Sequence, residues 1–445
     1  MEISFSSLLK KLFLLGVGYA AYRIISSTSH ITVQVVAAAA ACLVPALLVK
    51  LDVLHPWCWY GGFFALYTVA YPLLYMMGYA NYGYDRQILL YPLLGLYTAL
   101  MMIPGRSYSY ELARESEGFT VRTGVLNKFL YLLVALVLLG GSLYISRRGF
   151  ANKKDIYAAT GLLMTAVFRI PLILSILIPM VVVDHHNRVR KLPKNWILLG
   201  FAGVAAITLF SGERDLIFRF LIIMFLLLYY LGVIKKRHFL PVGALGLAAL
   251  PLSAVYKYFF LSGQVSAGKT ERGFLYSFLT ADFSSAGQNL EYLVELTESK
   301  GTLGFGRLFR DVISLFSSGE ISLTKWFNRT YFPNAKSGKG FTLVGEGYVI
   351  GDVAGVIIVF VIAGLLMRVF YRMSRRNMYW FSAYLYFIPL MIYSIRGDLS
   401  TIYAGIINQI LPIEIMIWAL VTASRRRAER KEAKEGAARA AGAPA

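Results

Sequence analysis

The 445-residue sequence contains only two cysteines and five histidines. Cys42 and Cys58 lie in or beside apolar segments and show no CxxC or Cys/His spacing, which argues against both a disulfide framework and a zinc site. No other group of residues has the spacing of metal ligands. We therefore expect no metal and no cofactor.

Acidic residues are also scarce, at 24 Asp and Glu against 45 Lys and Arg. Such an excess of positive charge can indicate a nucleic-acid partner, but in membrane proteins it usually lies in cytoplasmic loops. Hydrophobic residues make up 57% of the chain, and apolar runs recur near the roughly 20-residue length that crosses a bilayer. The sequence therefore predicts an all-α polytopic membrane protein with the lipid bilayer as a partner and no nucleic acid.

About twelve segments have the length and composition of transmembrane helices. They are 12–26, 31–50, 57–78, 87–104, 126–146, 157–183, 195–211, 215–234, 239–260, 342–369, 378–395 and 401–423. The first carries Arg23 and follows Lys10 and Lys11, a pattern shared with signal peptides, but no small-residue cleavage site follows it cleanly. We expect a single transmembrane domain over 1–423 and a polar tail over 424–445.

Positive residues in the short connections orient the chain. With a cytoplasmic N-terminus, most of these cations lie on the inner side, and the C-terminal tail falls there too. The inner cations are Arg106, Arg114, Arg122, Arg188, Arg190, Lys191, Lys194, Lys235, Lys236, Arg237, Arg372, Arg375 and Arg376. Arg147, Arg148, Lys153 and Lys154 lie on the outer side, either as a tolerated exception or as an anion-facing patch. Both termini are expected to be cytoplasmic.

The longest polar segment, 261–341, faces outward in this topology. It contains LTADFSSAGQNL at 279–290, and the Gly-rich GEGYVIG at 345–351 follows it. Loops of this length are usually lids, binding loops or small domains. We expect this external loop to form part of an active site.

Cations lie at the outer half of the expected membrane domain. Arg214, Lys257 and Arg396 border spans. Arg169 and Arg219 lie inside apolar runs, where an ionisable group normally faces a polar cavity or a partner, although Arg219 is close enough to a span end to snorkel. Guanidinium groups match phosphate oxygens and stay charged when desolvated. The pattern favours a phosphorylated lipid as ligand.

Outer carboxylates are the candidate catalytic groups, because the histidines are cytoplasmic or remote in this topology. The candidates are Asp282, Glu346, Asp352 and Asp398. Structural alternatives exist, since Asp282 can cap a helix that starts near Ser284 and Glu346 can pair with an arginine of a span. Asp398 can likewise pair with Arg396. Asp282 alone lies in a polar loop segment flanked by small residues, which favours it as a general base.

The C-terminal half carries motifs in an order typical of one family. They are SGERD at 211–215, the LTxDxxSxxxNL-like stretch with Asp282, Asn289 and Leu290, the turn of Gly345, Glu346 and Tyr348, and SIRGDL with Arg396 and Asp398. Through these motifs, the region from about 195 to 423 resembles the Wzy family, the oligosaccharide repeat-unit polymerases of O-antigen, capsule and enterobacterial common antigen pathways. The N-terminal half is similar only in its pattern of spans.

The resemblance implies a GT-C-like, metal-independent glycosyltransferase in the bacterial inner membrane. Donor and acceptor would both be undecaprenyl-diphosphate-linked glycans, undecaprenyl diphosphate would leave, and a separate membrane protein would regulate chain length. Asp282 would accept the proton of the acceptor hydroxyl, and Glu346 would orient a sugar hydroxyl or an arginine. The substrate-binding residues would be Arg169, Arg214, Arg219, Lys257, Tyr348, Arg396 and Asp398.

Two other functions fit parts of this pattern. An O-antigen ligase, which transfers finished glycan to a lipid A core, resembles these polymerases but typically relies on a histidine in the large outer loop, and 261–341 contains none. A transporter or flippase for lipid-linked glycan could use arginines within the membrane to guide the head group, but the sequence shows neither inverted repeats nor paired broken spans. The polymerase is the favoured interpretation.

Overall fold

The computed structural model describes residues 5–79, 84–108, 124–148, 162–211, 214–239, 241–243, 279, 283–313, 316, 322–333 and 340–440. Within these ranges the secondary structure is helical and includes no strand, which confirms the expected all-α class. Among the described helices, four are long and apolar enough to cross a membrane: Ile31–Leu48, Arg169–Val189, Leu343–Met373 and Leu399–Glu435. Gln87–Met102 and Gly124–Gly140 are shorter apolar helices. These helices are those of a multi-pass membrane protein.

The chain divides into two compact units. Unit 1 comprises Met1–Ser109, Gly232–Arg372 and Phe387–Ile406, and unit 2 comprises Tyr110–Leu231, Met373–Tyr386 and Ile407–Ala445. The helices of unit 1 are α1 (Phe5–Ser27), α2 (Ile31–Leu48), α3 (Pro56–Met76), α4 (Gln87–Met102), η2 (Lys236–His238), α13 (Ser284–Lys300), α14 (Gly306–Ile313), α15 (Leu323–Tyr331), most of α16 (Leu343–Met373) and α18 (Leu399–Gly405). Those of unit 2 are α6 (Gly124–Arg148), α8 (Leu162–Val189), α9 (Lys194–Ser211), α10 (Arg214–Tyr230) and α19 (Leu411–Ala440). Helix α17 (Met378–Ser394) passes from unit 2 to unit 1, and the single domain expected over 1–423 stays a prediction.

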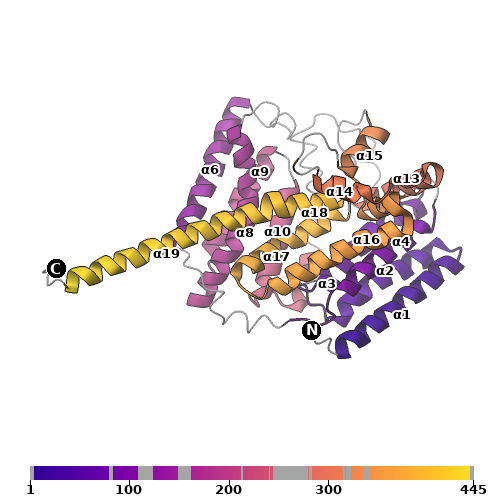
Figure 1. The fold of residues 1–445 in the computed structure, drawn as a ribbon, viewed down its shortest axis with the longest axis horizontal. Coiled ribbons are helices and arrows are strands. Elements are labelled where there is room, and N and C mark those ends of the chain that lie inside the picture. The colour runs from indigo at the N-terminus through magenta and orange to yellow at the C-terminus, as the bar shows by residue number, and fades with distance from the viewer. Residues whose placement is uncertain are drawn as a thin grey trace. The chain divides into compact units, whose positions relative to one another are not determined.

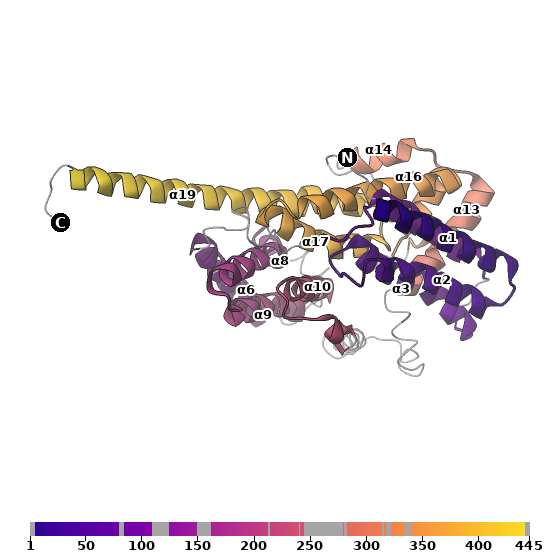
Figure 2. The same cartoon turned by 90° about the horizontal axis from the view of Figure 1, so that it is seen from below.

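Helices α1 to α4 pack against one another in unit 1, and both views show α1 beside α2 (Figures 1 and 2). The alanine run at 37–41 of α2 favours a helix and keeps its surface small. A Cβ at Gly61 of α3 would lie 2.5 Å from the carbonyl oxygen of Cys42, so this approach requires glycine. Trp57 and Tyr60 are fully buried, and they help form the core of the bundle.

One end of the bundle, here called the His55 end, is closed by side chains that bind backbone carbonyls. Lys10 Nζ donates to Gly105 O at 3.1 Å, and Lys11 Nζ donates to Met101 O at 2.6 Å. His55 Nδ1 accepts from the Trp57 N–H, so the proton lies on Nε2, which is 3.0 Å from Pro104 O. Burial lowers the pKa of His55 to about 3, and the ring is therefore neutral near pH 7.

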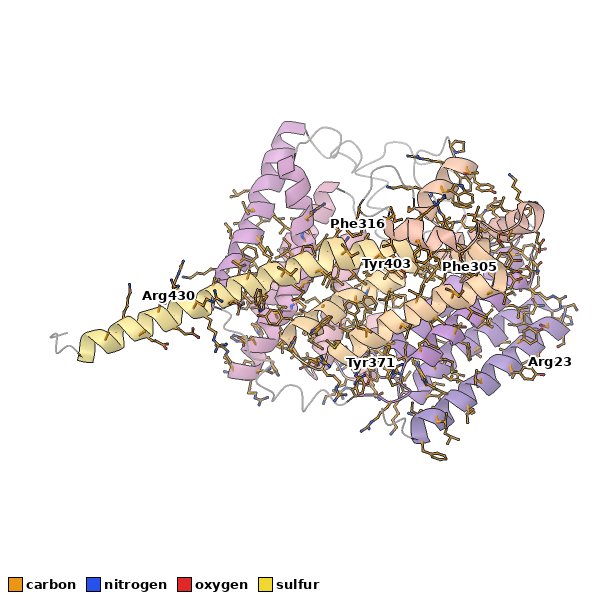
Figure 3. The ribbon with its side chains drawn as sticks, in the orientation of Figure 1. Arg23, Phe305, Phe316, Tyr371, Tyr403 and Arg430 are labelled. Carbon is orange, nitrogen blue, oxygen red and sulfur yellow. The ribbon has the colours of Figure 1, made fainter. Side chains whose placement is uncertain are left out.

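An aromatic contact extends the His55 end to α16. Tyr371 lies near the end of that helix (Figure 3), and its ring centroid is 4.9 Å from that of His55 and 4.7 Å from that of Tyr108. The Tyr371 hydroxyl also accepts a hydrogen bond from the Tyr108 N–H at 3.2 Å. The last turns of α16 therefore pack beside the start of α3.

The opposite end, here called the Tyr71 end, joins the other helix termini. The Tyr84 hydroxyl donates to Gln34 Oε1 at 2.6 Å, which links the start of α4 to α2. The Tyr71 hydroxyl donates to Glu291 Oε2 at 2.6 Å, which links the end of α3 to α13. Close contact of Gly287 with Tyr71 adds to this packing. The Tyr71 end therefore connects the bundle to the described part of segment 261–341, which the sequence predicts to be an external loop.

Helix α16 is broken at Gly351 and Asp352, where the backbone torsions are not helical (φ −163°, ψ 33° and φ 55°, ψ −142°). The span predicted over 342–369 lies within the candidate membrane helix Leu343–Met373, but the sequence did not predict this break. The structure has a short buried helix at 343–350 and a longer one at 353–373. A Cβ at Gly355 would lie 2.0 Å from Gly347 O, so small residues allow the two segments to approach closely.

A small hydrophobic core lies beneath α13, α14 and α15. Its buried members are Leu293, Leu323, Phe327, Phe341, Val349 and Ile350, with Leu308 and Trp326 packed at its edge. These residues come from α13, α14, α15 and the short segment of α16. We call α13, α14, α15 and residues 340–350 the cap. The described part of the predicted loop is therefore a folded element with its own core.

In unit 2, α6, α8 and α9 pack against one another, and α19 contacts α6 and α8. Figure 2 shows α6, α8 and α9 side by side. A Cβ at Gly200 of α9 would lie 1.9 Å from a methyl group of Ile178, which explains a glycine at this crossing. Helix α19 continues through Arg430 (Figure 3) to Ala440, with an Arg425–Glu429 ion pair at 2.9 Å. The polar tail predicted at 424–445 is thus helical where it is described.

Candidate functional site

The predicted site residues fall into three groups. Asp282 and Lys257 lie outside the described residues, and Arg214 begins α10 without a described side chain. Unit 1 holds Glu346, Tyr348, Arg396 and Asp398, and unit 2 holds Arg169 and Arg219. Each unit is described separately below.

Glu346 lies in the short segment of α16 and has no exposed surface. Its Oε2 atom accepts a hydrogen bond from the Leu399 N–H at 2.7 Å. Leu399 is the first residue of α18, so the N–H group has no partner within its own helix. Glu346 therefore fixes the start of α18 against the short segment of α16.

Asp398 is the N-cap of α18, and the residue is 1% exposed. Oδ1 accepts from the Ser400 hydroxyl at 2.7 Å and from the N–H and hydroxyl of Thr401 at 3.0 and 2.8 Å. Oδ2 accepts from the N–H and hydroxyl of Thr324 at 2.9 and 2.7 Å. Asp398 thus ties α18 to the first turn of α15. Sequence reasoning missed Thr324, because a partner 74 residues away leaves no local signal.

Arg396 lies in the turn between α17 and α18 and is partly buried. Its guanidinium carbon lies 4.9 Å from the ring centroid of Tyr393, a cation–π distance. Its backbone carbonyl accepts from the Phe341 N–H at 2.8 Å. Asn289 Nδ2 donates to the carbonyl of Gly340. The chain at 340–341 therefore bridges α13 to the turn that carries Arg396.

These contacts bring together three segments that are distant in the sequence. Asn289 comes from the LTADFSSAGQNL stretch, Glu346 from the Gly-rich turn, and Arg396 with Asp398 from SIRGDL. Each motif contributes to one connected network in unit 1, within or beside the cap. We call this network the cap site. Arg396, which is partly buried, joins this network through its backbone carbonyl, and the two buried carboxylates are engaged with backbone and hydroxyl groups.

Tyrosines and a glutamate extend this region at the Tyr71 end. The ring centroids of Tyr348 and Tyr91 lie 4.7 Å apart. Glu291, which follows the LTADFSSAGQNL stretch directly, binds the Tyr71 hydroxyl. Burial raises the pKa of Glu291, and the hydrogen bond from Tyr71 opposes that shift. Sequence reasoning missed Tyr71, Tyr91 and Glu291, although the position of Glu291 beside the motif was a usable signal.

In unit 2, Arg219 forms an ion pair with Asp215 at 2.7 Å, with 12% of the arginine side chain exposed. The guanidinium also lies beside the Tyr386 hydroxyl, which donates to Gln409 Oε1 at 2.6 Å. Gln409 belongs to a π-helical segment, Ile406–Ile410. Arg219 is therefore held by an acidic partner one turn away, which sequence reasoning did not weigh.

Arg169 is exposed in the third turn of α8, two residues before Pro171. The Ser175 hydroxyl donates to the carbonyl oxygen of Pro171 itself at 2.7 Å. The cavity expected at Arg169 stays a prediction. Within the ranges that the structure describes, no three His, Cys, Asp or Glu side chains gather closely enough to hold a metal ion. Metal independence also stays a prediction.

Comparison with known proteins locates the relationship in the C-terminal part of the chain. Residues 323–426 match the family model of the O-antigen polysaccharide polymerase Wzy. The match covers Glu346, Tyr348, Arg396 and Asp398 and leaves Asn289 and Asp282 outside it. No curated protein and no solved structure matches the chain. The family match confirms the resemblance to Wzy-type O-antigen polymerases that the motifs of this part of the chain show.

Proposed function

We propose that this chain polymerises undecaprenyl-diphosphate-linked oligosaccharide repeat units at the outer face of the bacterial inner membrane. A hydroxyl of the acceptor sugar attacks the anomeric carbon of the donor glycan, and the bond from that carbon to the diphosphate oxygen breaks. The hydroxyl proton passes to a carboxylate, and undecaprenyl diphosphate leaves. The proposal includes about twelve spans in a GT-C-like arrangement with both termini in the cytoplasm.

The convergence of separate motifs in the cap site carries this proposal. Asn289, Glu346, Arg396 and Asp398 come from segments up to about a hundred residues apart, yet one chain of hydrogen bonds connects their backbones and side chains. A loop that only connects two helices does not need such a network at the end of an apolar helix. A catalytic site does require it, because reacting groups must be held within a fraction of an ångström.

Arg396 is the described group best suited to the leaving diphosphate. A guanidinium presents a planar fork that matches phosphate oxygens, and it stays charged when partly buried. Glu346 holds the N–H of Leu399, and Asp398 caps α18 and binds Thr324, so both fix the turn that carries Arg396. We assign Glu346 and Asp398 as positioning residues on this ground. Stabilisation of a developing diphosphate charge by a fixed cation is the expected source of rate acceleration.

The remaining predicted residues keep proposed roles. Asp282 is the proposed general base, at a chain position just before α13. Arg214, Lys257 and Arg169 are proposed contacts of the diphosphate. Arg219 is proposed to act with them, with its ion pair to Asp215 holding the guanidinium in place.

Purified full-length chain in liposomes, supplied with lipid-linked repeat units, tests the proposal. A ladder of glycan lengths supports polymerisation, transfer only to lipid A core would show a ligase, and translocation without covalent change would show a transporter. We expect Arg396→Ala to abolish the ladder. Arg329 is an exposed arginine on α15, and Arg329→Ala should leave the ladder intact. Asp282→Asn should lower the rate by about 10²–10⁴ without loss of donor binding. A separate chain-length regulator would change the distribution of lengths and leave the linkage unchanged.

A further inference from the structure

Helix α14 exposes large apolar side chains in a segment that the sequence places outside the membrane. Phe309 is 72% exposed, Ile313 is 51% exposed, and Phe316, just after the helix, is 74% exposed. The Phe316 N–H donates to Ile313 O at 2.9 Å, so the backbone at Phe316 forms a turn directly after α14. Soluble surfaces rarely present such a contiguous apolar stripe unless it binds something.

The arrangement around α14 is amphipathic. At about 100° per residue, Leu308, Phe309, Val312 and Ile313 fall within an arc of roughly 140°. Arg310 lies outside that arc and is exposed. Leu308, at one edge, packs onto the core of the cap, and the rest of the arc points away from it. The helix is therefore anchored to the protein through one edge and presents the remaining apolar side chains outward.

Two hydrogen bonds join the chain just before α14 to the residues just before the break in α16. The N–H groups of Leu303 and Gly304 donate to the carbonyls of Val349 and Ile350 at 2.8 and 3.0 Å. Those carbonyls directly precede the break in α16, and the segment 353–373 that follows is about 31 Å long at 1.5 Å per residue, which matches a hydrocarbon core of about 30 Å. The start of α14 is thus tethered at the boundary of the membrane-spanning segment.

We propose that α14, with Leu303, Phe305 and Phe316, lies in the head-group region of the bilayer and anchors the cap to it. We call these residues the α14 stripe. Eight residues of α-helix extend about 12 Å, far too short to cross the membrane, so α14 lies at the surface. Phe305 and Phe316 flank the helix (Figure 3). Exposed Lys300 and Arg310 supply the positive charge that favours anionic lipid.

Anchoring of the cap has a consequence for the cap site. The ring of Phe305 contacts Gly351, where a Cβ would lie 2.5 Å from a ring carbon. The α14 stripe therefore connects the bilayer surface to the break in α16, a few residues from Glu346. This role concerns the bilayer itself and holds whether or not the chain is a polymerase.

Photo-crosslinking of the full-length chain tests this proposal. Benzoylphenylalanine replaces Phe309 in one variant and Glu295, exposed on α13, in a matched control. Both variants are placed in vesicles of phosphatidylethanolamine and phosphatidylglycerol that contain no lipid-linked saccharide, so a lipid adduct can come only from the bilayer. We expect a phospholipid adduct at position 309 and none at position 295. Absence of that adduct, or crosslinking of position 309 to a second copy of the chain, overturns the proposal.

Charge is tested separately with Arg310→Glu in the position-309 background. The yield of phospholipid adduct should fall several-fold in vesicles that contain phosphatidylglycerol and change little in vesicles of phosphatidylcholine alone. If Arg310→Glu changes the adduct yield equally in both kinds of vesicle, anionic lipid makes no contribution.

Discussion

Replacement of Glu346 separates a positioning residue from a general base. In Glu346→Ala the Leu399 N–H loses its acceptor inside a fully buried site, which costs about 1–3 kcal/mol for the stranded group. In Glu346→Gln the amide oxygen can still accept that hydrogen bond, so the cost should stay near 1 kcal/mol or below. The alanine variant should therefore melt at a clearly lower temperature than the glutamine variant.

Activity gives the second half of this test. A glutamine cannot accept a proton, so it would lower the rate by about 10²–10⁴ if Glu346 were the base. We expect Glu346→Gln to extend glycan within about tenfold of the unsubstituted chain, because a change of about 1.4 kcal/mol corresponds to a factor of ten. The assay is the glycan ladder in liposomes, normalised to folded protein. A glutamine variant that melts like the parent yet makes no polymer would refute the positioning role.

Other substitutions test the network and the break in α16. Asp398→Ala should destabilise unit 1 by at least about 2 kcal/mol, since it removes a helix cap and two bonds to Thr324; a melting temperature equal to that of Asp398→Asn would contradict this. Asp352→Gly should raise the melting temperature, because a φ of 55° with a ψ of −142° costs any residue but glycine about 1–3 kcal/mol in backbone strain. A lower melting temperature would show that the carboxylate is needed there. Because the pKa of Glu291 is raised, the folded state binds more protons than the unfolded state, so stability should fall as pH rises from the ordinary glutamate pKa to the raised one. Glu291→Gln should flatten this dependence of the melting temperature on pH between pH 4 and 8.

The sequence predicted the class and the family because both depend on local patterns. Apolar runs of membrane-spanning length are visible without any tertiary information. The motifs around Asn289, Glu346 and Asp398 could be ordered along the chain, and their order was enough to indicate the family whose model matches residues 323–426.

The geometry of the site could not be predicted in the same way. Hydropathy does not depend on backbone torsion, so the apolar run through Gly351 was interpreted as one span although the helix breaks there. Thr324 is 74 residues from Asp398 and Leu399 is 53 residues from Glu346, and spacing along the chain carries no information about such contacts. A pair between Asp398 and Arg396 was one structural alternative, and the structure shows the oxygens of Asp398 engaged by Thr324, Ser400 and Thr401.

The lysine contacts at the His55 end set an order for biosynthesis. Lys10 finds its carbonyl partner 95 residues later in the chain, and Lys11 finds its partner 90 residues later. At translation rates of about 5–20 residues per second, α1 waits on the order of 5–20 s before α4 has been made. During that interval both ammonium groups need other partners, which water or lipid phosphates at the membrane surface can supply. Helix α1, which is made before α2, α3 and α4, therefore gains these two contacts only after α4 has been made.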